Sequence, residues 1–426
     1  MLTRFFSGSI SFRRDDAIKI ILLFVIHLLY FVGLRWIDNA SYSLFLENWG
    51  AAELSSMFVA SAVLIVIFGA VYGFLAARIS HEKLLTVLAL GIIAWLASVE
   101  ILQRTPGFAG QRGIVYPYFF LLTGVLGDIG AAHILIYLSE FYDTRAAKRA
   151  LPVLVSASIA GAIIAGALAP TLKTKLGLDN LPLATIACLL LILVCVYALR
   201  ILVPQEIELA EQRVRSALVN WQKNPARGNL RFLRELGIVR WLVLSTFVLV
   251  VLMKLLTFQS GLIFEAEYKG NPGALFDFYS AIDVYASIAG LIFSSLIFGP
   301  MIVRFGIGKM NMLFPLITLG AIGALNLSPN LSTAVLGRVN DRVLKKVFRN
   351  PLDAMLLNSV PTRVKARARN FVNGASNSLG TLATGLLTLA IAARDLTPNQ
   401  VIGVSLLLAV VYIFSAWRLR AEYSRA

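Results

Sequence analysis

The chain has 426 residues, of which 58% are apolar and 15% charged, with a formal net charge of +16. Because a soluble globular protein is closer to half apolar and a quarter charged, this composition excludes an ordinary soluble protein. Apolar runs of about twenty residues recur, each long enough to cross a hydrocarbon core of ~30 Å, and they predict an integral membrane protein of the all-α class.

Twelve apolar windows, each bounded by polar residues, predict twelve transmembrane helices. In chain order they cover roughly residues 17–46, 53–77, 84–102, 114–139, 150–171, 181–203, 239–266, 274–302, 309–327, 331–359, 370–392 and 398–417. The first window is interpreted as an uncleaved span, because no small-residue cleavage site closes a short apolar core. The window at 331–359 is heavily charged, and we keep it as a span because the distribution of basic residues requires it.

Lys and Arg are distributed unevenly between the two sides of this predicted topology. Only six lie in the loops opposite the termini, namely Arg104, Arg112, Lys173, Lys175, Lys269 and Arg394. Because cytoplasmic loops carry the excess of Lys and Arg, both termini and the linker at 204–238 are expected in the cytoplasm. We expect a monomer in a bacterial inner membrane. Topology and anionic headgroups account for the net charge, so no nucleic-acid partner is expected.

Three segments recur in order at nearly constant offset. GLRWIDNASYSLF (33–45) aligns with LMKLLTFQSGLIF (252–264), GFLAARIS (73–80) with GPMIVRFG (299–306), and TRAAKRALPVLVSAS (144–158) with TRVKARARNFVNGAS (362–376). The repeat predicts two six-helix halves of the same orientation, at 1–203 and 239–426. Such parallel six-helix pseudo-repeats resemble the major facilitator superfamily, in which the substrate binds between the halves near mid-membrane.

The tenth predicted span contains a basic stretch, GRVNDRVLKKVFRN (337–350). Its basic residues are Arg338, Arg342, Lys345, Lys346 and Arg349. At ~100° per residue all but Lys346 fall within about 60° of one another. A charge at the bilayer centre costs roughly 2.5–3.5 kcal/mol even on the lenient insertion scale. The surplus over Asp341 and Asp353 predicts an anionic ligand. Internal salt bridges and a solvated helix end are the alternative.

Other charges lie in, or at the end of, the first, fourth and seventh predicted spans. They are Arg35, Asp38, Asp128, His133, Glu140 and Lys254. These spans and the tenth occupy equivalent places in the two halves, and in the major facilitator fold they line the central cavity. Asp128, His133 and Glu140 are also candidate proton carriers. The alternatives are an Arg35–Asp38 ion pair within one turn and a packed, hydrogen-bonded His133.

Four segments resemble a narrower family, the ATP/ADP translocases and their bacterial relatives. They are RWID (35–38), FLENWGAAEL (45–54), FYDTRAAKRALPVLVSASIAGAIIAG (141–166) and FRNP (348–351). The resemblance implies transport of a nucleotide or another organic anion. By this resemblance, Arg35 would contact the nucleotide. Lys345 and Arg349 are given the same role only because they lie close to the matching segment of the tenth span. Asp38 stands where the family usually has Lys.

The leading hypothesis is a secondary transporter that moves an anionic, phosphorylated or carboxylated solute through a cationic cavity by alternating access. Two alternative hypotheses are a lipid or lysophospholipid transporter and a non-transporting membrane sensor with the same fold. The sequence contains no nucleophile elbow, phosphate-binding Gly loop or metal-ligand cluster, so neither an enzyme nor a cofactor is expected. The substrate-binding set predicted here is Arg35, Asp38, Lys254, Arg338, Arg342, Lys345 and Arg349. Gln at Lys345 or Arg349 is expected to abolish ligand protection and leave the fold intact.

Overall fold

A computed structural model describes residues 14–142, 144–205, 207–208, 236–360, 368–369, 371–393 and 398–425. The N-terminal half contains α2 (Arg14–Trp49), η1 (Ala51–Glu53), α3 (Leu54–Ala76), α4 (His81–Arg104), α5 (Val115–Glu140), α6 (Thr144–Leu176) and α7 (Leu181–Leu202). The C-terminal half contains α10 (Gly237–Glu267), α11 (Pro272–Ile292), η2 (Phe293–Phe298), α12 (Gly299–Leu327), α13 (Leu331–Val339), η3 (Asn340–Arg349), α14 (Asn350–Asn358), η4 (Phe371–Ala375), α16 (Ser376–Ala393) and α17 (Pro398–Tyr423). Most of the predicted linker lies outside the described residues.

The described chain is helical and contains ten segments long and apolar enough to cross a membrane. One of them, Pro272–Leu327, covers two predicted spans. Its helices are separated at Gly306, whose φ of 75° and ψ of 158° interrupt the helix. The segment from Leu331 to Asn358 is also helical, but it is too rich in charged residues to be counted among those ten apolar segments. The all-α membrane class is therefore confirmed, and the count of twelve spans stays a prediction.

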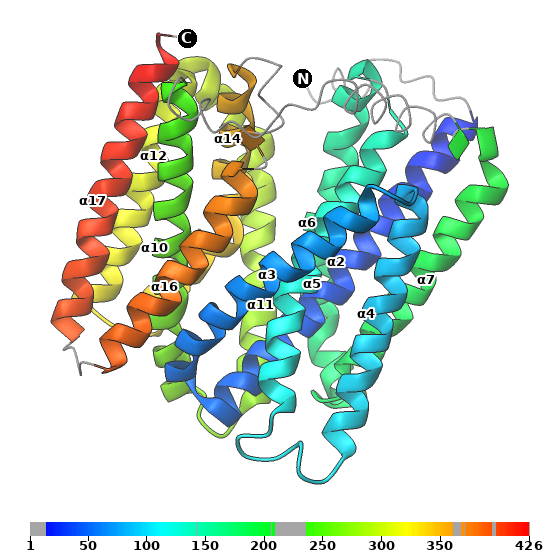
Figure 1. Cartoon of the computed structure of the whole chain (residues 1–426), viewed down its shortest axis with the longest axis horizontal. Coiled ribbons are helices and arrows are strands. Elements are labelled where there is room, and N and C mark those ends of the chain that lie inside the picture. Colours follow the sequence, from blue (N-terminus) through cyan, green and yellow to red (C-terminus); the bar gives the residue numbers. More distant parts are fainter. Residues whose placement is uncertain are drawn as a thin grey trace.

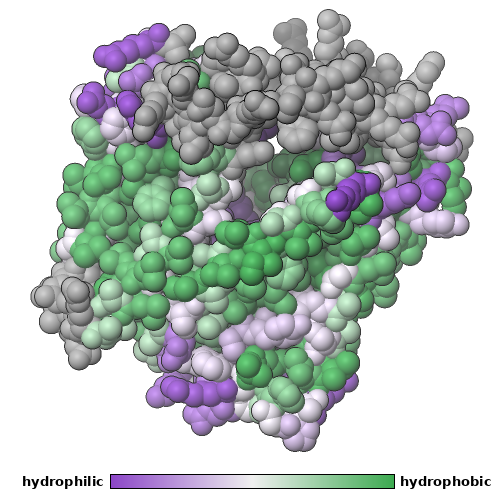
Figure 2. Space-filling model, in the orientation of Figure 1, coloured by the Kyte–Doolittle hydropathy of each residue, from purple (hydrophilic) through white to green (hydrophobic). Residues whose placement is uncertain are grey.

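The helices form two bundles that lie side by side (Figure 1). Helix α2 packs on α5, α6 and α7 in one bundle, and α10 and α12 pack on α17 in the other. One apolar core lies around Trp95 and Phe119 in the first bundle. A second lies around Phe314 and Phe348 in the other bundle and extends to Phe45 and Phe58 of the first. Hydrophobic residues cover the middle of the surface, as expected for a lipid-facing belt (Figure 2).

The two halves pack against each other through α3 on α16 and α6 on α11. Glycines permit the close approach of backbones in both pairs. A Cβ at Gly166 on α6 would lie 2.5 Å from the carbonyl oxygen of Ser280 on α11. A Cβ at Gly385 on α16 would lie 2.8 Å from the backbone nitrogen of Val59 on α3. The two halves are therefore in direct backbone contact at these points.

Helix α2 begins and α17 ends at one end of the molecule, which we call the termini end (Figure 1). The opposite, far end carries the connections after α2 and α10. There Glu265 accepts a hydrogen bond from the Ala51 N–H at 2.6 Å, and Glu47 accepts one from the Gly270 N–H at 3.0 Å. These contacts join the halves at the far end.

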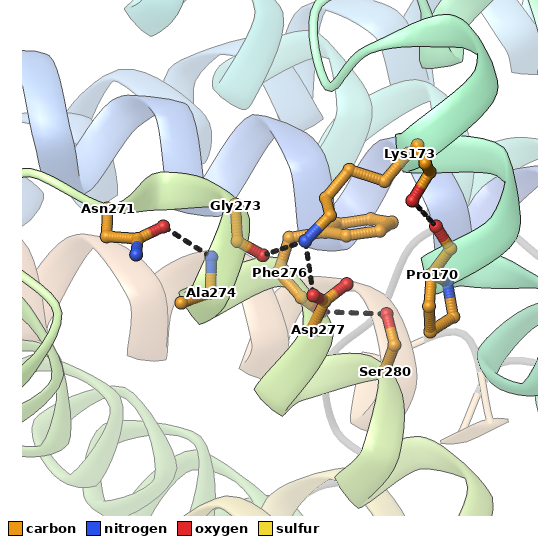
Figure 3. A network of polar contacts seen from close by, with 9 residues as sticks. Pro170, Lys173, Asn271, Gly273, Ala274, Phe276, Asp277 and Ser280 are labelled. Atoms are coloured by element: carbon orange, nitrogen blue, oxygen red, sulfur yellow. Dashed lines mark hydrogen bonds and ion pairs between the residues drawn. The ribbon is translucent and has the colours of Figure 1, made fainter.

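A lysine on α6 reaches across to the start of α11 at the same end (Figure 3). Lys173 forms an ion pair with Asp277 and donates a hydrogen bond to the Gly273 carbonyl at 3.2 Å. The far end is thus closed by hydrogen bonds, an ion pair and helix packing. Figure 2 shows a hollow between the halves toward the termini end.

We expect Gly166→Leu to separate the halves at the far end, because the new side chain meets the backbone of α11. Overpacking of this kind costs about 1–3 kcal/mol. The measurement is maleimide labelling of a cysteine placed at the buried Ser260, in a chain in which Cys188 and Cys195 are replaced by Ala. Faster labelling is expected. Gly69→Leu is the control, since nothing lies within 4 Å of that position, and equal rates in the two variants would contradict the prediction.

Candidate functional site

Charged side chains from both halves gather at mid-helix positions between the bundles. They are Arg35 and Asp38 on α2, Asp128 on α5, Lys254 on α10, Asp283 on α11, Arg338 on α13, and Asp341, Arg342, Lys345 and Lys346 on η3. Each interacts electrostatically with others of the group. Six are basic and four are acidic, so this central cluster has an excess of two positive charges.

Two ion pairs in the central cluster join the halves. Arg342 pairs with Asp38, and Arg35 Nη1 lies 3.6 Å from Asp283 Oδ1. Asn39 donates a hydrogen bond to Asp283 Oδ2 at 3.0 Å. The predicted Arg35–Asp38 pair within one turn is therefore replaced by pairs that reach from α2 to the C-terminal half. Asp283 was not predicted as a site residue, although the sequence shows it as one of two carboxylates inside the eighth predicted span.

Arg338 lies between two tyrosines from opposite halves. Its guanidinium carbon is 5.0 Å from the ring centre of Tyr42 and 4.4 Å from that of Tyr279, within the range of cation–π attraction. Arg338 is 92% buried, and its Nη2 has no hydrogen-bond partner among the described residues. Beside it is a pocket of about 10 Å³, enough for about one water molecule. Its lining is Tyr42, Leu256, Thr257, Ser260, Phe264, Gly337 and Arg338.

The lysines of the central cluster have fewer partners than the arginines. Lys254 lies over the ring of Phe58, with 5.3 Å from Nζ to the ring centre, and Lys346 is 6.0 Å from the ring of Phe31. Within the described part of the chain, neither has a carboxylate within 4 Å. Lys345 has one at 3.7 Å, on Asp341, and both of these side chains are 30% exposed. Lys254 and Lys346 therefore differ from Arg35 and Arg342 in having no carboxylate partner among the described residues.

Arg349 lies elsewhere, inside the C-terminal half, and is completely buried. It is bound to Asp353 at 2.9 and 3.0 Å, to Asn311 Oδ1 at 2.7 Å and to Ser245 Oγ at 3.1 Å. Every one of these groups belongs to the C-terminal bundle. The structure thus places Arg349 away from the cavity face that the sequence predicted for it.

The reason is the winding of η3, which is a π-helix over Asn340–Arg349. Its i→i+5 hydrogen bonds widen each turn, so the chain rotates by roughly 80–85° per residue in place of 100°. Over ten residues the difference reaches about half a turn. A helical wheel for an α-helix placed Arg349 beside Arg338 and Arg342, and the π-helix turns it to the opposite side.

The three predicted proton carriers do not lie together. Asp128 is exposed and interacts electrostatically with the lysines of the central cluster. His133 is fully buried and hydrogen-bonded to the Tyr72 hydroxyl at 3.0 Å and the His81 carbonyl at 2.9 Å, which matches the packed alternative. Glu140 contacts the His81 ring. His133 and Glu140 thus belong to a separate cluster that ties α3 and α4 to α5.

Solved structures of similar fold are membrane transporters. A nucleoside transporter, NupG, matches with a TM-score of 0.66 and 12% identity over 95% of this chain and 99% of its own. An auto-inhibited POT family peptide transporter matches with a TM-score of 0.64 and 12% identity over 96% of each chain. The xylose transporter XylE from E. coli, in an inward-open conformation, matches with a TM-score of 0.60 and 14% identity over 93% of this chain and 94% of its own.

Comparison by sequence adds no relative, since neither a family model nor a curated protein matches the chain. The structural likeness spans nearly the whole chain, and at this identity it establishes the fold. The chain therefore has the all-α major facilitator fold that the internal repeat predicted.

Proposed function

We propose that this chain is a secondary transporter of an anionic solute, phosphorylated or carboxylated, which binds in the cavity between the two halves. The observation that carries the proposal is the pair Lys254 and Lys346, which have no carboxylate within ion-pair distance in the described structure. Both belong to a cluster with an excess of two positive charges. Because isolated charges at membrane depth are costly, an anion is the ligand that this cluster favours.

Two arginines of the central cluster support the same assignment, because carboxylates already occupy them. Arg35 and Arg342 pair with carboxylates, and Arg338 lies on two aromatic rings. A new anion would have to displace the carboxylates from Arg35 and Arg342, whereas Lys254 and Lys346 each contact only an aromatic ring, at 5.3 and 6.0 Å. We therefore propose Lys254 and Lys346 as the primary anion contacts, with Lys345 beside them.

The arrangement of the halves supports transport by alternating access. The far end is closed by Lys173–Asp277 and by helix packing, while exposed charges such as Asp128 and Lys346 lie at mid-helix below the termini end. With the termini in the cytoplasm, this is a state open to the cytoplasm. Rocking of one half against the other would open the far end in exchange. The transporters of similar fold include carriers of peptides, xylose and nucleosides.

The substrate is best sought by thermal stabilisation of the purified protein. A ligand at 100 times its Kd should stabilise the native state by about 2.7 kcal/mol. We expect stabilisation by at least one of ADP, glucose 6-phosphate and succinate, followed by flux of that anion into liposomes. ADP as the strongest ligand would support the resemblance to nucleotide transporters. Stabilisation by lysophospholipid alone would favour a lipid transporter, and binding without flux would favour a sensor.

The double variant Lys254→Gln/Lys346→Gln is expected to weaken binding of that anion by more than about a hundredfold. Each lost charge-assisted hydrogen bond removes about 1.5–3 kcal/mol. Titration calorimetry of the wild type and the variant gives the ratio of Kd values. Lys175→Gln at the exposed end of α6 is the matched control and should bind as the wild type does. Equal affinity in the double variant would remove these lysines from the site.

A further inference from the structure

We propose that Asp128 takes up a proton when the anion binds, so that the two are carried together. This inference rests on the proposed anion site and adds its coupling ion. Asp128 belongs to α5 in the N-terminal half, and the lysines with which it interacts belong to the C-terminal half. The carboxylate and the proposed anion contacts therefore belong to opposite halves of the molecule.

The charge state of Asp128 depends on the charged groups around it, because no side chain of the described residues is bound to it. It is exposed, and it has no ion-pair or hydrogen-bond partner of its side chain within the described residues. The groups that interact with its charge are Lys254 on α10, Lys345 and Lys346 on η3, and Asp38 and Tyr30 on α2. In the empty cavity the lysine ammonium groups are thus the main attraction on this carboxylate.

An anion bound at Lys254 and Lys346 competes with Asp128 for the same positive charge. The ligand neutralises the lysines and adds a negative charge nearby, and both effects disfavour an ionised carboxylate. Protonation of Asp128 removes the repulsion between the carboxylate and the ligand. By reciprocity, the protonated chain binds the anion more tightly.

The other carboxylates of the central cluster are less suited to this exchange. Asp38 and Asp283 are held by Arg342 and Arg35, and Asp341 by Lys345. Glu140 contacts the His81 ring outside the cavity. Among the described carboxylates, Asp128 therefore combines access to the cavity with the absence of an arginine partner.

The test measures protons and anion together on the purified full chain. ADP, glucose 6-phosphate and succinate are titrated by calorimetry in two buffers of different ionisation enthalpy, which gives the protons bound per anion. For the wild type we expect uptake of up to one proton per anion and an affinity that rises by up to about tenfold for each unit fall in pH. Asp128→Asn should bind the same anion with a proton uptake lower than that of the wild type by the share that Asp128 takes up, and with a correspondingly weaker dependence of Kd on pH.

Three further variants separate a specific role from a disturbed fold. Asp128→Glu should retain the uptake, and so should Glu140→Gln and His133→Gln, which change the separate cluster. Equal uptake in Asp128→Asn and the wild type, or anion binding by the wild type with no uptake, would overturn the coupling and leave the anion site standing. Binding of none of the three probes would overturn the anion site and the coupling with it.

Discussion

Replacing Arg349 with Gln is expected to destabilise the protein by about 3–5 kcal/mol, because it leaves a buried network without its cation. Arg349 has no exposed surface, and its guanidinium satisfies Asp353, Asn311 and Ser245 together. Glutamine is shorter and neutral, so the Asp353 carboxylate would be left without its counter-charge. Thermal or denaturant unfolding of the ligand-free protein measures the loss.

The partner residue gives a stringent check on this result. The double variant Arg349→Met/Asp353→Leu removes both charges and should lose less stability than Arg349→Gln alone, since an apolar pair can replace a buried ion pair. Arg418→Gln, on the exposed face of α17, should unfold as the wild type does. A stable Arg349→Gln protein that no longer responds to the anion would instead return Arg349 to the binding site.

The contrast with Lys345 shows how the structure changes the sequence-based expectation. Both residues were predicted to tolerate Gln and to lose ligand protection. Lys345 is 30% exposed and its contact with Asp341 is 3.7 Å, so Lys345→Gln is still expected to leave the fold intact. The same substitution at Arg349 now predicts unfolding, because a π-helix directs that side chain into the bundle.

Much of the architecture follows from hydropathy and charge alone. Apolar windows place the helices, and the internal repeat predicts a fold of two parallel halves that the transporter structures confirm. The rule that intramembrane charges face protein or water places Arg35, Lys254 and Arg342 between the halves. Each of these inferences depends on hydropathy, charge or repeated segments, which a sequence displays directly.

What the sequence could not show depends on backbone geometry and on partners far away in the chain. The π-helix at Asn340–Arg349 has no evident signature in a pattern read at 100° per residue. The pairing of Arg35 with Asp283 joins residues 248 positions apart, and the apparent partner within one turn, Asp38, pairs with Arg342 instead.

The ion pair between Asp38 and Arg342 is expected to hold the present arrangement of the halves, and Asp38→Asn should weaken it. Asp38 is on α2 and Arg342 on η3, so separating the halves at this level must break the pair. A fully buried pair would lose about 3–5 kcal/mol when one partner is removed. Because the Asp38 side chain is 33% exposed, solvent screens the interaction, and about 1–2 kcal/mol is expected.

A double-mutant cycle of Asp38→Asn and Arg342→Gln isolates this interaction from other effects of either change. The reporter is the cysteine at Ser260, which should label faster in Asp38→Asn, as in Gly166→Leu. Steric and electrostatic perturbations would then produce the same opening by independent means. If the two substitutions are additive, with no coupling free energy, the pair contributes nothing to closure, and helix packing and the contacts at the far end alone keep the halves together.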